Sequence, residues 1–246
     1  MDALIVIPSR WGSTRFPGKP LAQIAGQTLI GRVIDRAKQS ARAGAIWVAT
    51  DDERIAAEAV RHGVSATMPS GTYESGTDRI AAALQHIEAQ AGHRFSQIIN
   101  VQGDEPLLDI STVDAMIAVL QESESDIDIA TLCCALASEE EYADPDVVKV
   151  VLDGAGNALY FSRAPIPAGD WRLARRHVGV YGYQRLALAR FAALPQTPLE
   201  RSERLEQLRA LVNGFTIRVL ETDAPHLGVD RPEDVRRIEE ELARVR

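Results

Sequence analysis

A loop near the N-terminus concentrates residue types that bind phosphate. Residues 10–21 have the sequence RWGSTRFPGKPL, with three cations, two hydroxyls and two glycines, and they follow the apolar run 3–8. Glycines let backbone N–H groups approach phosphate oxygens, while arginine and lysine supply charge. The loop is not a Walker P-loop, because five residues rather than four separate Gly12 from Gly18-Lys19, and Pro20 stands where a magnesium-binding hydroxyl is needed. A solvated basic turn is the alternative, which the position after a buried strand disfavours.

Two aspartates stand in loops that are expected to reach the same sheet edge. Asp104 follows the apolar run 97–101 in a Gly-Asp-Glu-Pro turn, and Asp230 follows Gly228-Val229, close to a final helix that is predicted to begin at Pro232. Mg²⁺ that also has phosphate ligands needs only one or two protein carboxylates, so this pair would suffice. A turn aspartate at 104 and a helix-capping aspartate at 230 remain the structural alternatives.

The elements that must position these loops alternate between strand and helix. The apolar runs 3–8, 45–49 and 97–101 suit strands that are buried on both faces, and stretches with helical periodicity lie between and after them. Thr50 or Asp51 is predicted to cap the second helix, and Thr77 the third. The alternation predicts an α/β fold with a doubly wound, mostly parallel, Rossmann-like sheet, whose ligand site lies at the carboxyl ends of the strands.

The second half of the chain is richer in β-structure. Runs at 147–152 and 158–161 flank the turn residues 153–157 and predict an antiparallel hairpin, and residues 177–183 form a further β run. A helix over about 202–211 is predicted before the last strand. We therefore expect one domain over residues 1–246, with a β-rich insertion at about 142–183.

Length and composition exclude several classes of protein. The 246 residues are 46% hydrophobic, which is enough for one α/β domain, and the net charge of −8 argues against an extended nucleic-acid interface. Only Cys133 and Cys134 occur, so no disulfide framework can form and a reducing cytoplasm fits. No apolar run approaches membrane-spanning length, and the run 3–7 is too short for a signal peptide. We expect a soluble, cytoplasmic protein with small-molecule partners, no nucleic acid and no membrane insertion.

The loop at 10–21 closely resembles the signature of the 3-deoxy-manno-octulosonate cytidylyltransferase family, the CMP-Kdo synthetases, and the likeness extends along essentially the whole chain. The further matching segments are ATD at 49–51, SGTDR at 75–79, NVQGDEP at 100–106, KVV at 149–151, YFSR at 160–163, HVGVYGY at 177–183, LEQLR at 205–209 and GVD at 228–230. Their order and spacing make the match specific. Asp78 departs from the family's usual Glu and keeps the carboxylate.

The resemblance implies a nucleotidyltransferase-like fold and a specific reaction. The anomeric hydroxyl of 3-deoxy-manno-octulosonate (Kdo) attacks the α-phosphorus of CTP and pyrophosphate leaves, giving CMP-Kdo for lipopolysaccharide biosynthesis. Such an enzyme supplies positioning and charge neutralisation rather than a covalent nucleophile. By resemblance, Arg10 and Lys19 hold the triphosphate, and Asp104 and Asp230 are catalytic residues that bind the cofactor Mg²⁺. The family also implies a homodimer, which we expect to form through the β-rich insertion.

The same resemblance implies the residues that bind the two substrates. Ser13 and Arg15 line the first loop, and Ser75 with Gly76 suits contacts to ribose, base or phosphate. The residues implied for the acid sugar are Gln102, Arg163, His177, Tyr181, Glu206 and Gln207. Arg163 is the best of them, because an arginine can clamp a carboxylate in bidentate geometry.

Structural alternatives stay open for the other sugar-side residues. His177 and Tyr181 could be packed strand residues, while Glu206 and Gln207 could be the solvated face of a helix. Lys149 lies inside an apolar run, where an edge-strand charge would explain it.

Two rival functions also remain. One is transfer of CMP to a related acid sugar, either the 8-amino analogue of Kdo or a sialic acid, and the run 15–19 disfavours the sialic acid. The other is a catalytically silent nucleotide-sensing module. The presence of Arg10, Lys19, Asp104 and Asp230 speaks against that module.

Overall fold

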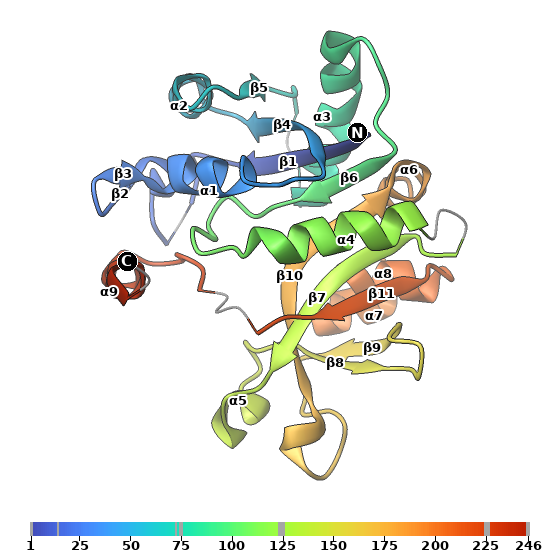
Figure 1. Cartoon of the computed structure of the whole chain (residues 1–246). Coiled ribbons are helices and arrows are strands. Elements are labelled where there is room, and N and C mark those ends of the chain that lie inside the picture. The colour runs from blue at the N-terminus through green and yellow to red at the C-terminus, as the bar shows by residue number, and fades with distance from the viewer. Residues whose placement is uncertain are drawn as a thin grey trace. The chain divides into compact units, whose positions relative to one another are not determined.

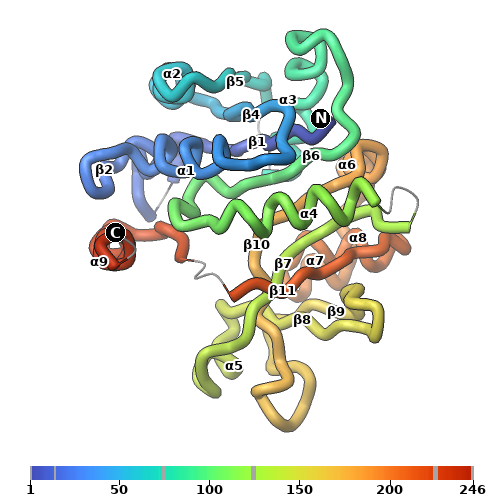
Figure 2. The backbone as a smooth tube through the Cα atoms, viewed as in Figure 1, coloured from blue at the N-terminus to red at the C-terminus, as the bar shows by residue number. Residues whose placement is uncertain are grey.

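The computed structural model describes residues 2–13, 15–71, 73, 76–122, 126–223 and 227–244 (Figures 1 and 2). The chain divides into two compact units. The first consists of Met1–Asp114 and Pro225–Arg246, and the second of Ala115–Ala224. The expectation of a single domain with an insertion stays a prediction.

The first unit is built on a parallel sheet, in which β1 is flanked by β4 and β6 (Figure 1). Its strands are β1 (Ala3–Ser9), β4 (Ala43–Thr50), β5 (Ser65–Thr67) and β6 (Gln97–Asn100). Each neighbouring pair is parallel, and the spatial order is β6-β1-β4-β5. Most of β1 and all of β6 is buried, which explains the continuous apolar runs in the sequence. The predicted strands are confirmed here.

The helices of this sheet create a switch point beside β1. They are α1 (Leu29–Ala37), α2 (Glu53–Arg61) and α3 (Gly76–Ala91). Right-handed crossovers place α1 and α2 on one face and α3 on the other, because the chain runs from β1 outward to β5 and then returns to β6 on the opposite side of β1. The loops after β1 and β6 therefore diverge, and the ligand crevice of a doubly wound sheet opens at such a point.

Three predicted helix starts are wrong. Asp52 caps α2 by accepting a hydrogen bond from the backbone N–H of Arg54 at 2.9 Å. Thr50 still belongs to β4, and the carboxylate of Asp51 accepts the backbone N–H of Trp11 instead. Thr77 lies inside α3, which begins at Gly76. The last helix, α9, spans Asp234–Arg244 and so begins after Pro232.

The second unit contains a mixed sheet. Its strands are β7 (Ile129–Ala135), β8 (Lys149–Leu152), β9 (Ala158–Ser162), β10 (Arg175–Gln184) and β11 (Ile217–Glu221). β7 pairs in parallel with β11 and antiparallel with β10, while β8 and β9 form the predicted hairpin. β7 is a strand that was not predicted from the sequence.

The remaining elements are short apart from α4. They are α4 (Ile110–Glu122), α5 (Glu139–Ala143), α6 (Arg185–Ala192), α7 (Pro198–Glu203), α8 (Gln207–Val212), the 3-10 turns Lys19–Leu21 and Trp171–Leu173, and the small strands β2 (Gln23–Ile24) and β3 (Gln27–Thr28). The predicted helix over 202–211 is wrong, because Arg204 adopts left-handed backbone angles and ends α7 before α8 begins. Across the described residues, no helix combines the length and apolar character that a bilayer span requires.

Candidate active site

A polar pocket of about 300 Å³ lies within the first unit, at the loops that follow β1 and β6. It is lined by Pro8, Ser9, Arg10, Ser13, Arg15, Lys19, Pro20, Tyr73, Gly76, Arg79, Gln102, Gly103, Asp104 and Asp230. The structure thus brings together the predicted catalytic residues and the predicted first-unit substrate residues, except for Ser75, which lies outside the described residues.

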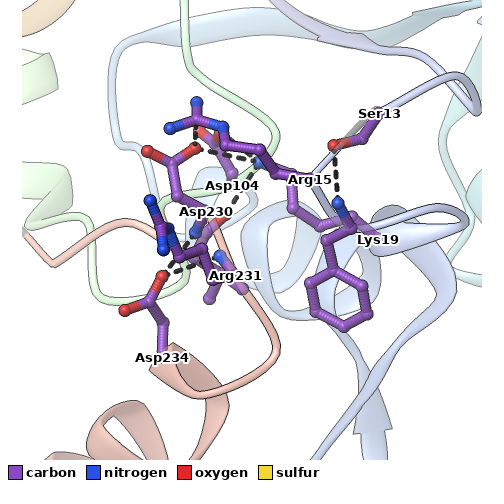
Figure 3. A network of polar contacts seen from close by, with 9 residues as sticks. Ser13, Arg15, Lys19, Asp104, Asp230, Arg231 and Asp234 are labelled. Atoms are coloured by element: carbon purple, nitrogen blue, oxygen red, sulfur yellow. Dashed lines mark hydrogen bonds and ion pairs between the residues drawn. The ribbon is translucent and has the colours of Figure 1, made fainter.

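The ammonium of Lys19 joins the two predicted metal ligands (Figure 3). Lys19 Nζ lies 2.7 Å from Asp104 Oδ2 and 3.7 Å from Asp230 Oδ1, and it donates to the carbonyl of Val229 at 2.7 Å. Arg15 donates to the same Asp230 oxygen at 3.1 Å. Two carboxylates and two cations therefore converge on one side of the pocket.

The loop 10–21 is folded so that Lys19 turns inward. Gly18 has a φ of 70°, and a Cβ at that position would approach the ring of Trp11 to 2.9 Å, so both the angle and the space require glycine. The backbone N–H of Trp11 donates to Asp51 at 3.0 Å, and the guanidinium of Arg54 lies 3.4 Å above the Trp11 ring. These contacts anchor the loop at its base.

Backbone contacts bring Asp104 and Asp230 together from distant parts of the chain. The N–H of Val229 donates to the carbonyl of Asp104 at 2.9 Å. Val229 is fully buried in an apolar cluster with Ile24 of β2, Leu29 of α1 and Ile238 of α9. This cluster packs the segment before α9 against β2 and α1.

Asp234, rather than Asp230, closes the turn at the start of α9. Its carboxylate accepts the backbone N–H groups of Asp230 and Arg231, both at 2.8 Å. Partial burial opposes ionisation of Asp234, but these donors and the nearby arginines hold its pKa below the ordinary value. The carboxylate of Asp230 instead faces Lys19 and Arg15, so the helix-capping alternative is not what the structure shows.

Arg79 is a pocket residue to which the sequence analysis assigned no role. Its side chain is 9% exposed, and Nη2 lies 3.4 Å from Asp51 Oδ2. Nη1 is buried and has no hydrogen-bond partner among the residues that the structure describes. A buried donor left unpaired costs free energy, which makes this guanidinium a candidate ligand-binding group. The sequence did hold a signal for Arg79, because it ends the segment SGTDR at 75–79, one of the segments that resemble the family.

Arg163, in the second unit, is held by neutral acceptors. Its Nε donates to the carbonyl of Glu203 and its Nη1 to the carbonyl of Pro145, both at 2.9 Å. The Glu203 carboxylate accepts the backbone N–H of Arg163 at 2.8 Å, and Asp146, at 3.9 Å from Nη1, is 97% exposed. The guanidinium is therefore fixed in place while its charge remains weakly compensated, as recognition of an anionic group would require.

Lys149 is not an exposed edge-strand charge, so that alternative is wrong. The residue is fully buried, and its ammonium donates to the carbonyls of Asp144, Val147 and Arg163 at 2.6 to 2.8 Å. These three bonds satisfy all of its donors and fix the backbone of Arg163.

His177 and Tyr181 lie close together on β10, with ring centroids 5.5 Å apart. The ring of Phe161 meets His177 edge-on at 4.9 Å. Burial lowers the pKa of His177 from its ordinary 6.5 to about 3, so the ring is neutral. Burial raises the pKa of Tyr181, and the nearby groups of Tyr183 and Glu206 raise it further. The Glu206 carboxylate is therefore close enough to Tyr181 to act on it electrostatically.

Gln207 is buried at the start of α8, and Glu206 is half-buried. The solvated-face alternative is therefore wrong for Gln207. The predicted second-unit residues therefore lie directly after β9, on β10 and at the start of α8.

Comparison with known proteins identifies the family. Residues 4–219 match the family model described as Cytidylyltransferase. The chain is 47% identical to the 3-deoxy-manno-octulosonate cytidylyltransferase of Syntrophotalea carbinolica, covering 98% of this chain and 99% of that protein. The relative of the same name from Solibacter usitatus is also 47% identical, over 95% of this chain and 91% of that one.

Solved structures agree with this assignment. The structure of CMP:2-keto-3-deoxy-manno-octonic acid synthetase complexed with CTP superimposes with a TM-score of 0.92 at 38% identity, with full coverage of both chains. A cytidylyltransferase from Leptospira borgpetersenii, at 18% identity and a TM-score of 0.68 over 99% of this chain and 87% of that one, shares the fold. The predicted α/β fold class is confirmed, and the chain belongs to the 3-deoxy-manno-octulosonate cytidylyltransferase family.

Proposed function

We propose that this enzyme transfers CMP from CTP to the anomeric hydroxyl of Kdo, yielding CMP-Kdo and pyrophosphate for lipopolysaccharide biosynthesis. The sugar oxygen forms a bond to the α-phosphorus, the bond from that phosphorus to the bridging oxygen of pyrophosphate breaks, and the hydroxyl proton is released. The observation that carries the proposal is the pocket at the β1–β6 switch point, in which Lys19 faces Asp104 and Asp230.

The first unit supplies the groups that a nucleoside triphosphate needs. Arg10, Arg15 and Lys19 line the pocket as cations, and Arg79 offers a buried donor. Charge that develops on the departing pyrophosphate is stabilised by such fixed cations, which need no reorganisation during the reaction.

The donor set also fits Mg²⁺. Asp104 and Asp230 provide hard oxygen ligands, and the ammonium of Lys19 already lies between them, so the position accepts a cation. Among the described residues no cluster of three or more His, Cys, Asp or Glu side chains could hold a metal, which suits an ion completed by phosphate oxygens and water. When bound, Mg²⁺ would neutralise phosphate charge at these two aspartates.

The second unit supplies candidate groups for the acid sugar. The weakly compensated charge of Arg163 suits the Kdo carboxylate, while His177, Tyr181, Glu206 and Gln207 offer hydrogen-bonding groups for its hydroxyls. Gln102, which lines the pocket of the first unit, is a further candidate for binding the sugar.

We further propose a cytoplasmic homodimer. Cys133 and Cys134 are free thiols, which suits a reducing compartment. The segment 142–183 exposes Leu159 and Leu173 at 61% and 69%, which supports a contact through that segment. Light scattering of the purified protein tests the dimer.

A pyrophosphate-release assay tests the reaction. We expect turnover with CTP, Mg²⁺ and Kdo or its 8-amino analogue, little turnover with a sialic acid, and lower activity when UTP replaces CTP. Absence of turnover on the whole acid-sugar panel would reject the proposal and favour a nucleotide-sensing module. Comparison of Kdo with the 8-amino analogue decides which sugar the enzyme prefers.

A further inference from the structure

The hydroxyl of Thr131 contacts three groups at once. Thr131 is fully buried in β7, and its Oγ1 lies 3.0 Å from His177 Nε2, 2.8 Å from the carbonyl of Val180 and 3.2 Å from the carbonyl of Val178. A threonine hydroxyl has one proton and two lone pairs, so it can donate only one hydrogen bond.

The two carbonyls are present because β10 is irregular opposite Thr131. Val178 pairs with Leu132 and Tyr181 with Thr131, so Gly179 and Val180 are extra residues on the β10 side. Such a bulge interrupts the ladder and leaves backbone groups that need another partner.

The direction of the hydrogen bond to His177 follows from this arrangement. Thr131 Oγ1 lies 2.8 Å from the Val180 carbonyl oxygen, and two oxygens this close need a proton between them. A carbonyl has no proton to give, so the single proton of Thr131 goes to Val180 or to the neighbouring Val178 carbonyl. The oxygen of Thr131 must then accept from His177, which therefore carries its proton on Nε2. Burial holds the pKa of His177 low, so the ring is neutral and its other nitrogen, Nδ1, has only a lone pair to offer.

We propose that Thr131 is a positioning residue that fixes His177 as the Nε2–H tautomer, so that Nδ1 accepts a hydrogen bond from a hydroxyl of the acid sugar. The sugar part of this inference rests on the proposed function. Within the described residues, Nδ1 forms no hydrogen bond to the protein. A neutral acceptor repels a carboxylate, so His177 serves a hydroxyl, and the substrate carboxylate is left to a cation such as Arg163.

The first test reads the tautomer without substrate. In protein labelled with ¹⁵N-histidine, long-range ¹H–¹⁵N correlation spectra distinguish the two neutral tautomers from the imidazolium, and His177→Gln identifies the signals of His177. We expect the Nε2–H tautomer in the wild-type protein from pH 6 to 8. A Nδ1–H tautomer or an imidazolium at pH 6.5 would overturn the inference.

The second test compares Thr131→Val with Thr131→Ser. Valine keeps the shape of the side chain but removes the hydroxyl, while serine keeps the hydroxyl. We expect Thr131→Val to show mixed His177 tautomers. Its KM for Kdo should rise by about tenfold or more, while its KM for CTP stays within about twofold of the wild-type value. Thr131→Ser should have the wild-type tautomer and the wild-type KM for Kdo. An unchanged Kdo KM in folded Thr131→Val contradicts the inference.

The two proposals fail in different ways. If the wild-type protein does not turn over Kdo, the proposed reaction is wrong, and the substrate-free spectra still decide the tautomer. If Thr131→Val does not fold, the spectra of the wild-type protein and of Thr131→Ser remain decisive, because loss of the Nε2–H tautomer in either protein rejects the role of Thr131.

Discussion

Lys19 Nζ lies 2.7 Å from Asp104 Oδ2, and the same ammonium donates to the carbonyl of Val229, the residue before Asp230. One side chain therefore connects the loop after β1 with both loops that carry the carboxylates. The Lys19 side chain is only 14% exposed, so this pair is less screened by solvent than the exposed pair of Arg15 with Asp230.

Asp104→Asn and Asp230→Asn should each reduce turnover by on the order of 10²-fold or more, because asparagine keeps the size but removes the charge that holds a metal. Folding should be retained. Turnover measured against Mg²⁺ concentration, with thermal unfolding as the control, checks this prediction.

Asp234→Asn is the matched control for the aspartate variants. It lies beside Asp230, but its carboxylate accepts only backbone N–H groups of the turn among the contacts described. We expect a stability loss of about 1 kcal/mol with near-normal turnover, because asparagine also accepts in turns. If the Asp104 and Asp230 variants behaved like Asp234→Asn, their assignment to the metal would be wrong.

Lys19→Met should change turnover and metal affinity in opposite directions. Turnover should fall by about 100-fold or more, because a main phosphate-binding cation is lost. Mn²⁺ should bind the substrate-free protein more tightly, by several-fold, because the ammonium no longer competes for Asp104 and Asp230. Titration of Mn²⁺ by electron paramagnetic resonance measures this affinity, and weaker binding than in the wild-type protein would contradict the competition.

Arg163→Ala should impair the use of Kdo while CTP binding survives. We expect the KM for Kdo to rise at least tenfold and the dissociation constant for CTP to stay within about twofold, since a charge-assisted contact contributes roughly 1.5–3 kcal/mol. Arg172→Ala is the control, because that exposed arginine pairs with Asp170 in its own turn. Loss of CTP affinity with an unchanged Kdo KM would reverse the assignment.

Lys149→Met should destabilise the protein by about 3 kcal/mol or more, because a fully buried ammonium is removed and the carbonyls of Asp144, Val147 and Arg163 lose their donor. Lys38→Met is the control, since its exposed ammonium meets the carbonyl of His62 and the change should cost under about 0.5 kcal/mol. Urea unfolding compares the two variants. Equal stability of both would show that the buried ammonium is not needed.

The pKa of His177 also predicts how stability depends on pH. Its value falls from 6.5 to about 3 on folding, so between these values the unfolded chain binds more protons than the folded protein. Stability should therefore fall as the pH falls below 6.5, by about 1 kcal/mol between pH 6.5 and 5.5 from this residue. The difference in unfolding free energy between the wild-type protein and His177→Gln isolates the effect.

Local sequence patterns determined the parallel half of the fold. The runs at 3–8 and 97–101 were recognisable because strands buried on both faces need continuous apolar residues, and α1 because its buried residues recur at the helical period. The phosphate-binding character of residues 10–21 was also visible, since charge and glycine content are properties of one segment.

Helix starts and breaks were less visible in the sequence. Asp52 caps α2 although Thr50 and Asp51 are equally suitable types, and Arg204 separates α7 from α8 without a glycine or proline. In the first case the choice depends on where β4 ends and on the contact of Asp51 with Trp11. Propensity alone does not contain that information.

Only the tertiary structure decided which polar residues meet. Asp104 and Asp230 come together through the Val229 backbone bond and the apolar cluster around it, and the donors of Lys149 are satisfied by carbonyls from separate segments. The sequence shows the types of these residues but not their partners, because hydrogen bonds and ion pairs depend on distances of about 3 Å between groups that are far apart along the chain.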